Sequence, residues 1–190
     1  GEIKPVYGTG SERLLASDKL EDWDLVPSKS HWTQTMQHLW EPGENGAKIR
    51  LSHFSEDIGS NYSAERDFPG LRSTSGLSAH LRFGEIDPKR IWFTVFDRFG
   101  DEQGTETFRK ELVWREFAHN VLFNVKDLAK IPIDARFLSF PWNDDPILQR
   151  AWKNGCTGYP VVDAGMRELI HTGSMHNRVR MICGSFFVKH

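Results

Sequence analysis

The sequence predicts an irregular all-α domain with long connecting loops. Signals for helix starts and stops recur along the chain, as in Asp87-Pro88 before one apolar segment and Gly100 after it. Residues 105–126 repeat apolar side chains at helical spacing. The chain shows no clear strand-like alternation, no internal repeat and no heptad pattern. These observations together favour helices packed around one core.

The start of the chain predicts a connector over residues 1–45, because proline, glycine and serine interrupt its short polar and aromatic pieces. A helical domain is predicted over 46–190. Its first helix spans about 46–58. A group of hydroxyl residues, 73–75, then caps a short helix that stops at Gly84.

Longer helices are predicted for the rest of the domain. The helix that opens at Asp87-Pro88 is followed by the strongest one, over 105–126. Prolines interrupt the loop region that comes next. Residues 151–190 then form two helices, which Thr172-Gly173 separates.

Composition limits the class of protein. The 190 residues are 38% hydrophobic with a mean hydropathy of −0.51, which suits one sizeable core and excludes a membrane-spanning helix. The formal charge of −2 gives no overall sign of nucleic-acid binding, and Cys156 and Cys183 lack metal-ligand spacing. The start of the chain has no secretory signal. We therefore expect a cytoplasmic monomer without a metal or a membrane contact.

Two of the predicted helices carry a polar face at the spacing i, i+3, i+4, i+7. The faces consist of Glu111, Trp114, Arg115 and Ala118, and of Asn177, Arg180, Met181 and Gly184. Each face joins polar, bulky and small side chains, a combination that suits contact with a ligand. The alternative for the first face is an ion pair between Glu111 and Arg115 beside a surface tryptophan.

The segment 74–78 combines three hydroxyls with free backbone amides at a helix N-terminus, where a phosphate is favoured. Simple helix capping is the alternative interpretation. His176 lies beside the second polar face and has no partner at metal-ligand spacing, so we interpret it as a packed or capping residue.

Several motifs resemble the flavin-binding domain of the DNA photolyase/cryptochrome family. They are NYSAERDFPG, STSGLSAHLRFGEIDPKRIW, ELVWREF, FPWNDDPILQRAW and TGYPVVDAGMRELIHTGSMHNRVRMICGSFFVKH. The resemblance covers about 46–190, and the sequence His176-Asn177-Arg178 resembles that of the photolyases that repair cyclobutane pyrimidine dimers. It implies a helical FAD-binding fold and damaged DNA with pyrimidine dimers as the partner. The implied reaction is light-driven: reduced FAD gives an electron to the dimer, the ring splits, and the electron returns.

The resemblance also implies roles for individual residues. FAD is expected to contact Tyr62, Thr74, Ser75, Gly76, Leu77, Ser78, Phe108, Arg115, Asn177 and Arg180. DNA and the lesion are expected to contact Arg66, Glu111, Trp114, Asn177, Arg178 and Met181. Glu111 and Asn177 are the catalytic candidates, with Trp142 as the buried end of an electron relay to the flavin. Glu111 acts as a hydrogen-bonding carboxylate or, when protonated, as a stabiliser of the radical anion.

The chain departs from the family pattern in two respects. Ser174 stands where the family motif has a tryptophan. The family's α/β antenna domain and the C-terminal part of the flavin domain are absent, so an antenna chromophore, folate or deazaflavin, is expected only in the missing domain. We therefore expect a fragment in which Arg180 lacks its carboxylate partner and FAD is held weakly. The alternatives are a cryptochrome-type photoreceptor without repair activity and a helical interaction module that has lost flavin function.

Overall fold

The computed structural model describes residues 18–25 and 31–190. Across these residues the regular elements are helices and no strand is present, which confirms the predicted all-α class. The α-helices are α1 (His31–Leu39), α2 (Glu44–His53), α3 (Tyr62–Glu65), α4 (Ser78–Phe83), α5 (Pro88–Phe99), α6 (Gln103–Asn124), α7 (Pro146–Lys153), α8 (Pro160–Thr172) and α9 (Asn177–Lys189). Shorter helical turns are η1 (Leu20–Trp23), η2 (Phe54–Ile58), η3 (Gly59–Asn61) and η4 (Ala135–Ser139). None of the described helices combines the length and the apolar character needed to cross a bilayer.

The predicted connector, 1–45, lies partly outside the described residues, in 1–17 and 26–30. Its described part contains α1, which packs against α8. Directly after α1, Trp40 Nε1 donates a hydrogen bond to the carbonyl of Thr172 at 2.7 Å. This segment therefore adds a helix to the packed structure, while the division into a connector and a domain at residue 46 stays a prediction.

Local sequence signals set the ends of several helices as predicted. At the start of α5, Asp87 Oδ1 accepts the backbone N–H of Lys89 at 2.8 Å. Gly84 and Gly173 end α4 and α8, each with a φ of 71°. This left-handed conformation carries little steric cost for glycine, so both helices stop where the sequence predicts.

Other helix ends differ from the prediction. The helix predicted over 46–58 changes after His53 into the wide turn η2, which the tighter turn η3 follows. The hydroxyls of residues 73–75 do not cap α4, because the residue before that helix is Leu77 and no side chain caps it. Ser73 Oγ donates instead to the carbonyl of Glu65 at 3.0 Å. The helix α7 forms within the segment predicted as a loop, where Asp145 caps its first turn.

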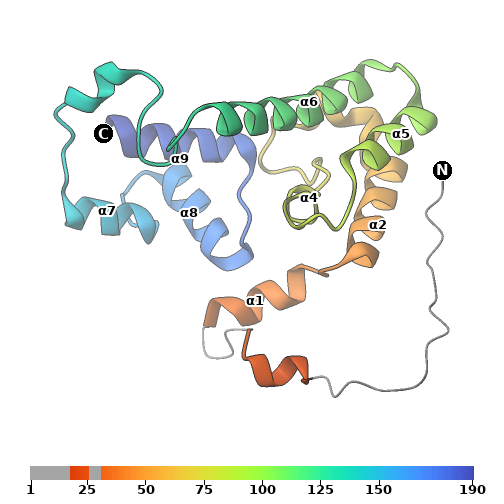
Figure 1. Ribbon diagram of the computed structural model, residues 1–190, viewed down its shortest axis with the longest axis horizontal. Helices are drawn as coiled ribbons and strands as arrows, with labels where there is room; N and C mark the ends of the chain where they lie inside the picture. The colour runs from red at the N-terminus through yellow and green to blue at the C-terminus, as the bar shows by residue number, and fades with distance from the viewer. Residues whose placement is uncertain (1–17, 26–30) are drawn as a thin grey trace.

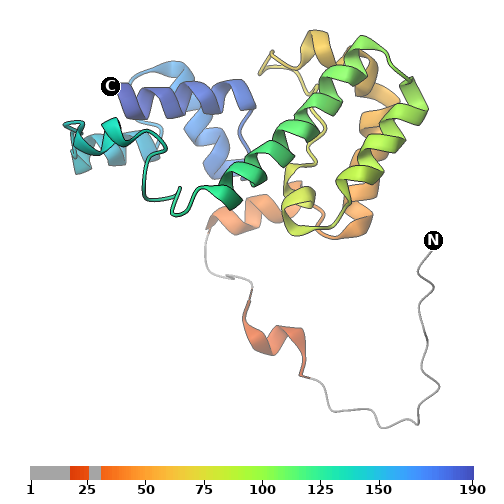
Figure 2. The same cartoon turned by 45° about the horizontal axis from the view of Figure 1, so that its top comes forward.

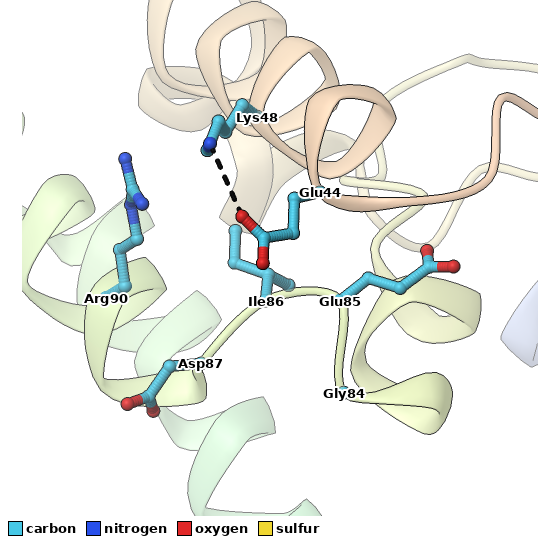
Figure 3. Close-up of a pocket in the computed structure, with 7 residues that line it drawn as sticks. All are labelled: Glu44, Lys48, Gly84, Glu85, Ile86, Asp87 and Arg90. Atoms are coloured by element: carbon cyan, nitrogen blue, oxygen red, sulfur yellow. Dashed lines mark ion pairs between the residues drawn. The ribbon is translucent and has the colours of Figure 1, made fainter. Parts of the chain in front are cut away.

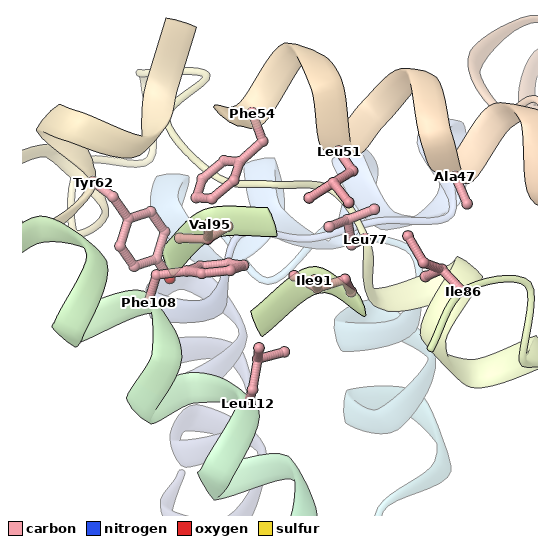
Figure 4. Packing of buried hydrophobic residues seen from close by; sticks show 10 residues of the cluster. All are labelled: Ala47, Leu51, Phe54, Tyr62, Leu77, Ile86, Ile91, Val95, Phe108 and Leu112. Carbon is pink, nitrogen blue, oxygen red and sulfur yellow. The ribbon is translucent and has the colours of Figure 1, made fainter. Parts of the chain in front are cut away.

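A first core fills the space between α2, α5 and α6 (Figure 4). Its buried residues are Ala47, Leu51, Phe54, Tyr62, Leu77, Ile86, Ile91, Val95, Phe108 and Leu112. Three of the rings are in mutual contact: the centroid of Phe54 lies 4.4 Å from that of Phe108 and 5.7 Å from that of Tyr62. Aromatic contacts at these distances add to the free energy of apolar burial. The core thus holds α6 close to Leu77, at the end of the loop that precedes α4.

A second, smaller core lies between α8 and α9. It consists of Val162, Met166, Met175, Val179 and Cys183. Figures 1 and 2 both show α7, α8 and α9 beside the group formed by α2 to α6, with α1 near α8. Each of the two polar faces predicted from the sequence therefore belongs to a helix with its own core.

Gly165 is where α8 approaches α9 most tightly. A Cβ at this position would lie 2.3 Å from Val179 Cγ1 and 3.0 Å from Cys183 Sγ. We expect Gly165→Ala to lower the free energy of unfolding by about 1–2 kcal/mol, because overpacking outweighs the gain in helix propensity. Gly184→Ala in α9 is the matched control, since no atom lies within 4 Å of its added Cβ. Chemical denaturation measures both changes, and equal stabilities of the two variants would contradict this packing.

Asp163 holds the turn that leads into α8. Its carboxylate accepts hydrogen bonds from the hydroxyl of Thr157 at 2.6 Å and from the backbone N–H groups of Thr157 and Gly158 at 2.7 and 2.9 Å. These bonds hold the pKa of Asp163 below its ordinary value, and the bond from the Thr157 hydroxyl has the largest effect. A lowered folded-state pKa stabilises the protein above the unfolded-state pKa of about 3.9, and the contribution is lost as pH falls through the folded-state pKa.

We therefore expect Asp163→Asn to lower the stability at neutral pH and to flatten its decline below about pH 4. Urea denaturation of both proteins between neutral and acidic pH measures this difference. Parallel curves with no offset would show that the carboxylate does not act in this way.

Candidate functional site

The loop between α3 and α4 contains the predicted phosphate-binding segment, 74–78. Thr74 and Ser78 are exposed and Ser75 is half-buried, whereas the side chain of Leu77 belongs to the first core. Ser75 Oγ accepts the backbone N–H of Leu77 at 3.4 Å. The loop is thus anchored by one apolar residue and presents its hydroxyls beside the core.

Arg50 on α2 brings a positive charge to this loop. Gly76 has a φ of +63°, and a Cβ there would lie 2.7 Å from Arg50 Nη1. The Arg50 guanidinium is held in place, because Nη2 donates to the carbonyl of Leu39 at 2.9 Å and the group lies 4.5 Å from the ring centroid of Trp40. Sequence reasoning missed Arg50, since nothing in its local pattern connects it with a loop that begins 24 residues later in the chain.

Two predicted flavin contacts, Tyr62 and Phe108, lie in the first core. Their ring centroids are 5.3 Å apart in an edge-to-face arrangement. Burial is the main cause that raises the pKa of the Tyr62 hydroxyl. Both rings therefore shape the wall of the site from within the core, and their contact with a cofactor stays a prediction. Arg115, half-buried on α6, donates from Nη2 to the carbonyl of Leu81 in α4 at 3.2 Å.

A chain of four charged groups joins α6 to α9. Arg66 pairs with Glu111, and Arg66 Nε lies 3.5 Å from Asp67 Oδ1. Arg178 makes two bonds to the same carboxylate, with Nε 2.8 Å from Oδ1 and Nη2 2.9 Å from Oδ2. The last pair joins residues separated by 111 positions. Three predicted lesion-binding residues thus lie in one network, which Asp67, absent from the sequence predictions, completes.

This network corrects the alternative interpretation of the α6 face. Glu111 does not pair with Arg115, because Arg66 takes its carboxylate, and Arg115 Nη1 lies 3.2 Å from Glu116 Oε1 instead. Trp114 on the same face is 62% exposed and touches Phe117 edge-to-face at 5.7 Å. The α6 face therefore presents a free indole surface beside a paired acid.

The second polar face, on α9, is open at several of its predicted positions. Asn177 and Met181 are exposed, and a Cβ on Gly184 would meet no atom within 4 Å. Arg180 Nη2 turns to the carbonyl of Met175 at 3.1 Å. Ile182 is exposed, and the buried side chains that enter the core from α9 are those of Val179 and Cys183.

The histidine before α9 caps it. His176 Nδ1 accepts the backbone N–H of Arg178 at 3.2 Å, which agrees with the interpretation of His176 as a capping residue. Across residues 18–25 and 31–190, no three His, Cys, Asp or Glu side chains gather as a metal site requires.

Trp142 differs from the prediction. It was expected to be the buried end of an electron relay, but its side chain is 51% exposed. The ring is held by Phe140, with centroids 4.6 Å apart, and by a hydrogen bond from Nε1 to the carbonyl of Phe137 at 3.1 Å. The segment around η4 contributes no buried residue, and the described residues leave about half of Trp142 exposed.

A small charged hollow of about 180 Å³ lies between α2 and the start of α5 (Figure 3). Its lining residues are Glu44, Lys48, Gly84, Glu85, Ile86, Asp87 and Arg90. Lys48 Nζ lies 3.5 Å from Glu44 Oε2, so the charges are partly paired within the hollow. None of the predicted site residues lines this hollow. Most of them lie on the 74–78 loop, α6 and α9, and the surface formed by these segments is the candidate site.

Comparison with known proteins gives consistent matches. The model of the FAD-binding domain of DNA photolyase matches residues 108–190. A deoxyribodipyrimidine photo-lyase of Agrobacterium fabrum is 44% identical over 176 residues, which are 92% of this chain and 37% of the relative. Cryptochrome-1 of Arabidopsis thaliana is 36% identical over 163 residues, 81% of this chain and 24% of the relative.

Solved structures agree with these matches. A bacterial class III photolyase from Agrobacterium tumefaciens has a TM-score of 0.90 and 42% identity, covering 96% of this chain and 38% of that one. A cryptochrome from Synechocystis has a TM-score of 0.67 and 31% identity, covering 79% of this chain and 32% of that one. The chain thus spans well under half the length of these proteins.

Proposed function

Because this chain belongs to the DNA photolyase and cryptochrome family, in its FAD-binding domain, we propose that it takes part in the light-driven repair of cyclobutane pyrimidine dimers in DNA. The observation that carries the proposal is the charged network from Glu111 through Arg66 and Asp67 to Arg178. It brings candidate lesion-binding residues of α6 and α9 to one surface. The relatives' activity is that of longer proteins, so the activity of this chain is the proposal to be tested.

The 74–78 loop supports FAD binding. Its hydroxyls and backbone amides suit the diphosphate, and Arg50 adds the cation that such a group favours. Arg115 is fixed on the carbonyl of Leu81, where it faces the helix that the loop opens. These residues would bind the cofactor and set its orientation, together with Tyr62 and Phe108 behind them.

The residues of α6 and α9 would hold the dimer. Trp114 offers an exposed indole for stacking on a flipped-out base, and Glu111 offers a carboxylate oxygen to a pyrimidine N–H. Asn177 and Met181 would contact the lesion from α9. Reduced FAD, when bound, supplies the light-excited electron that splits the cyclobutane ring. Trp142 stays a candidate for an electron relay, with Phe140 as its aromatic neighbour.

Two measurements on the purified chain test the proposal. Titration with FAD, followed by flavin fluorescence, should show binding that Arg50→Ala weakens about ten-fold, because a charged hydrogen-bond partner is lost. Arg90→Ala, in the hollow of Figure 3, is the matched control and should leave the affinity unchanged. Blue light with reduced FAD should then remove dimers from an oligonucleotide that contains them. Absence of light-dependent repair at saturating FAD would overturn the proposal.

A photoreceptor without repair activity is the second candidate, favoured by the likeness to a plant cryptochrome. It predicts FAD binding and a light-dependent change of the flavin spectrum, with dimers left intact. A helical interaction module without flavin function predicts no FAD binding at all. The two measurements therefore separate the three functions.

A further inference from the structure

Asp67 makes the charged network between α6 and α9 electrically neutral. The network contains two arginines, Arg66 and Arg178, and two carboxylates, Glu111 and Asp67. Surfaces that bind DNA mainly through its phosphates carry an excess of positive charge. Because the network itself carries no such excess, its affinity for an ordinary DNA backbone depends on whether its carboxylates stay in place.

The position of Asp67 on Arg178 matches that of a phosphate. The carboxylate takes both N–H groups of one guanidinium edge, through Nε and Nη2, which is the two-bond geometry that arginine also offers to phosphate. Nη1, on the other side of the group, lies 3.7 Å from Met181 Sδ. A phosphate that approaches the same Nε and Nη2 edge therefore competes directly with Asp67.

Asp67 is also free to give way. It lies in the turn after α3, its side chain is half exposed, and so is that of Arg178. The hydrogen bond from Arg178 is the main cause that holds the pKa of Asp67 below its ordinary value, so the group is ionised at neutral pH. An exposed pair of this kind contributes little to stability, which makes its exchange for another anion inexpensive.

We propose that Asp67 is a specificity-determining residue that occupies the phosphate position on Arg178 and thereby restrains binding to undamaged DNA. The inference rests on the proposed function for its ligand. Undamaged DNA gains only backbone contacts and must displace Asp67 to obtain them. A dimer is held by stacking on Trp114 and by contacts with Glu111 and Asn177, which do not require Asp67 to leave Arg178.

Binding of an undamaged duplex, measured by fluorescence anisotropy at several salt concentrations, tests the proposal. Asp67→Asn should raise the affinity about three- to five-fold at low salt, the range expected for an exposed ion pair. The slope of log affinity against log salt should steepen by about one, because one more phosphate is neutralised. Asp134→Asn is the matched control: it removes the same charge from another exposed aspartate–arginine pair, with Arg136, and should change neither quantity as strongly.

A double-mutant cycle tests whether Asp67 acts by occupying Arg178 or only by adding a negative charge to the surface. In an Arg178→Ala background, Asp67→Asn should no longer raise the affinity for the undamaged duplex. Asp67→Glu, which keeps the carboxylate, should bind like the original chain. A gain that persists without Arg178, or equals that of Asp134→Asn, would overturn the proposal. Circular dichroism and thermal unfolding verify that each variant is folded.

A duplex that contains a dimer completes the test. Asp67→Asn should leave its affinity nearly unchanged, so the ratio of the two affinities falls by about the same three- to five-fold. An unchanged ratio, with a clear preference for the dimer in the original chain, would contradict the inference alone. No preference for the dimer in any variant would contradict the proposed function. The affinities for the undamaged duplex would still show whether Asp67 keeps phosphate from Arg178.

Discussion

Replacement of Phe54 by alanine is expected to lower the free energy of unfolding by about 3–5 kcal/mol, the range for large aromatic side chains deleted from a core. The ring is fully buried, with 0% of its surface exposed. It contacts the rings of Tyr62 and Phe108, so its loss removes partners from both. The cavity would open beneath α6, the helix that carries Glu111.

Urea denaturation followed by circular dichroism measures this change. Phe123→Ala is the control, because Phe123 near the end of α6 is 88% exposed and its loss should change stability by less than about 0.5 kcal/mol. A loss of less than about 1 kcal/mol for Phe54→Ala would show that this ring does not organise the first core. Since stability losses of the larger size can unfold a small domain, the variant is studied at low temperature and in stabilising buffer.

Replacement of Glu111 by alanine is expected to reduce light-driven dimer repair about ten-fold or more, with FAD binding retained. The change removes a charged hydrogen-bond acceptor, worth about 1.5–3 kcal/mol, and leaves the largely buried Arg66 with only its longer contact to Asp67. Glu111→Gln keeps the shape and one acceptor oxygen, so a smaller reduction is expected. Asn177→Ala should lower repair in the same direction from the α9 side.

The measurement is the initial rate of dimer loss at saturating reduced FAD and fixed light intensity, with flavin content determined by absorbance. Glu106→Ala is the control: this glutamate lies in the first turn of α6 and pairs with Lys110 on the surface. Repair that is unchanged in both Glu111→Ala and Asn177→Ala would remove these residues from the site. A loss of bound FAD in step with repair would instead indicate a role in the fold of the cavity.

Local signals in the sequence were sufficient for much of the fold. The ends of α4, α5 and α8 follow from Gly84, Asp87 and Gly173, because each acts within one turn of its own position. The change of α2 into wide and tight turns was not predictable in this way. It accompanies the approach of Gly59 to Phe99, a contact between distant parts of the chain.

The candidate site shows the same limit. The spacing along α6 and α9 identified Glu111 and Asn177 as surface groups, and the family resemblance supplied their roles. Spacing alone favoured a pair between Glu111 and Arg115, whereas the folded chain brings Arg66 to Glu111. Asp67 and Arg50 were missed because Arg178 and the 74–78 loop, which they approach, lie far from them in the sequence. Burial of Trp142 was wrongly expected, since it depends on what packs over a loop and not on the loop itself.

Trp40 couples the stabilities of the two cores, because it contacts residues beside both of them. Its indole N–H binds the end of α8 through the carbonyl of Thr172, while its ring supports the guanidinium of Arg50 and lies 6.4 Å from that of His80. A ligand that fixes Arg50 at the 74–78 loop would therefore also restrict the second core, through the contact of Trp40 with the end of α8. Occupancy at one end of the molecule is expected to protect backbone amides at the other from hydrogen exchange.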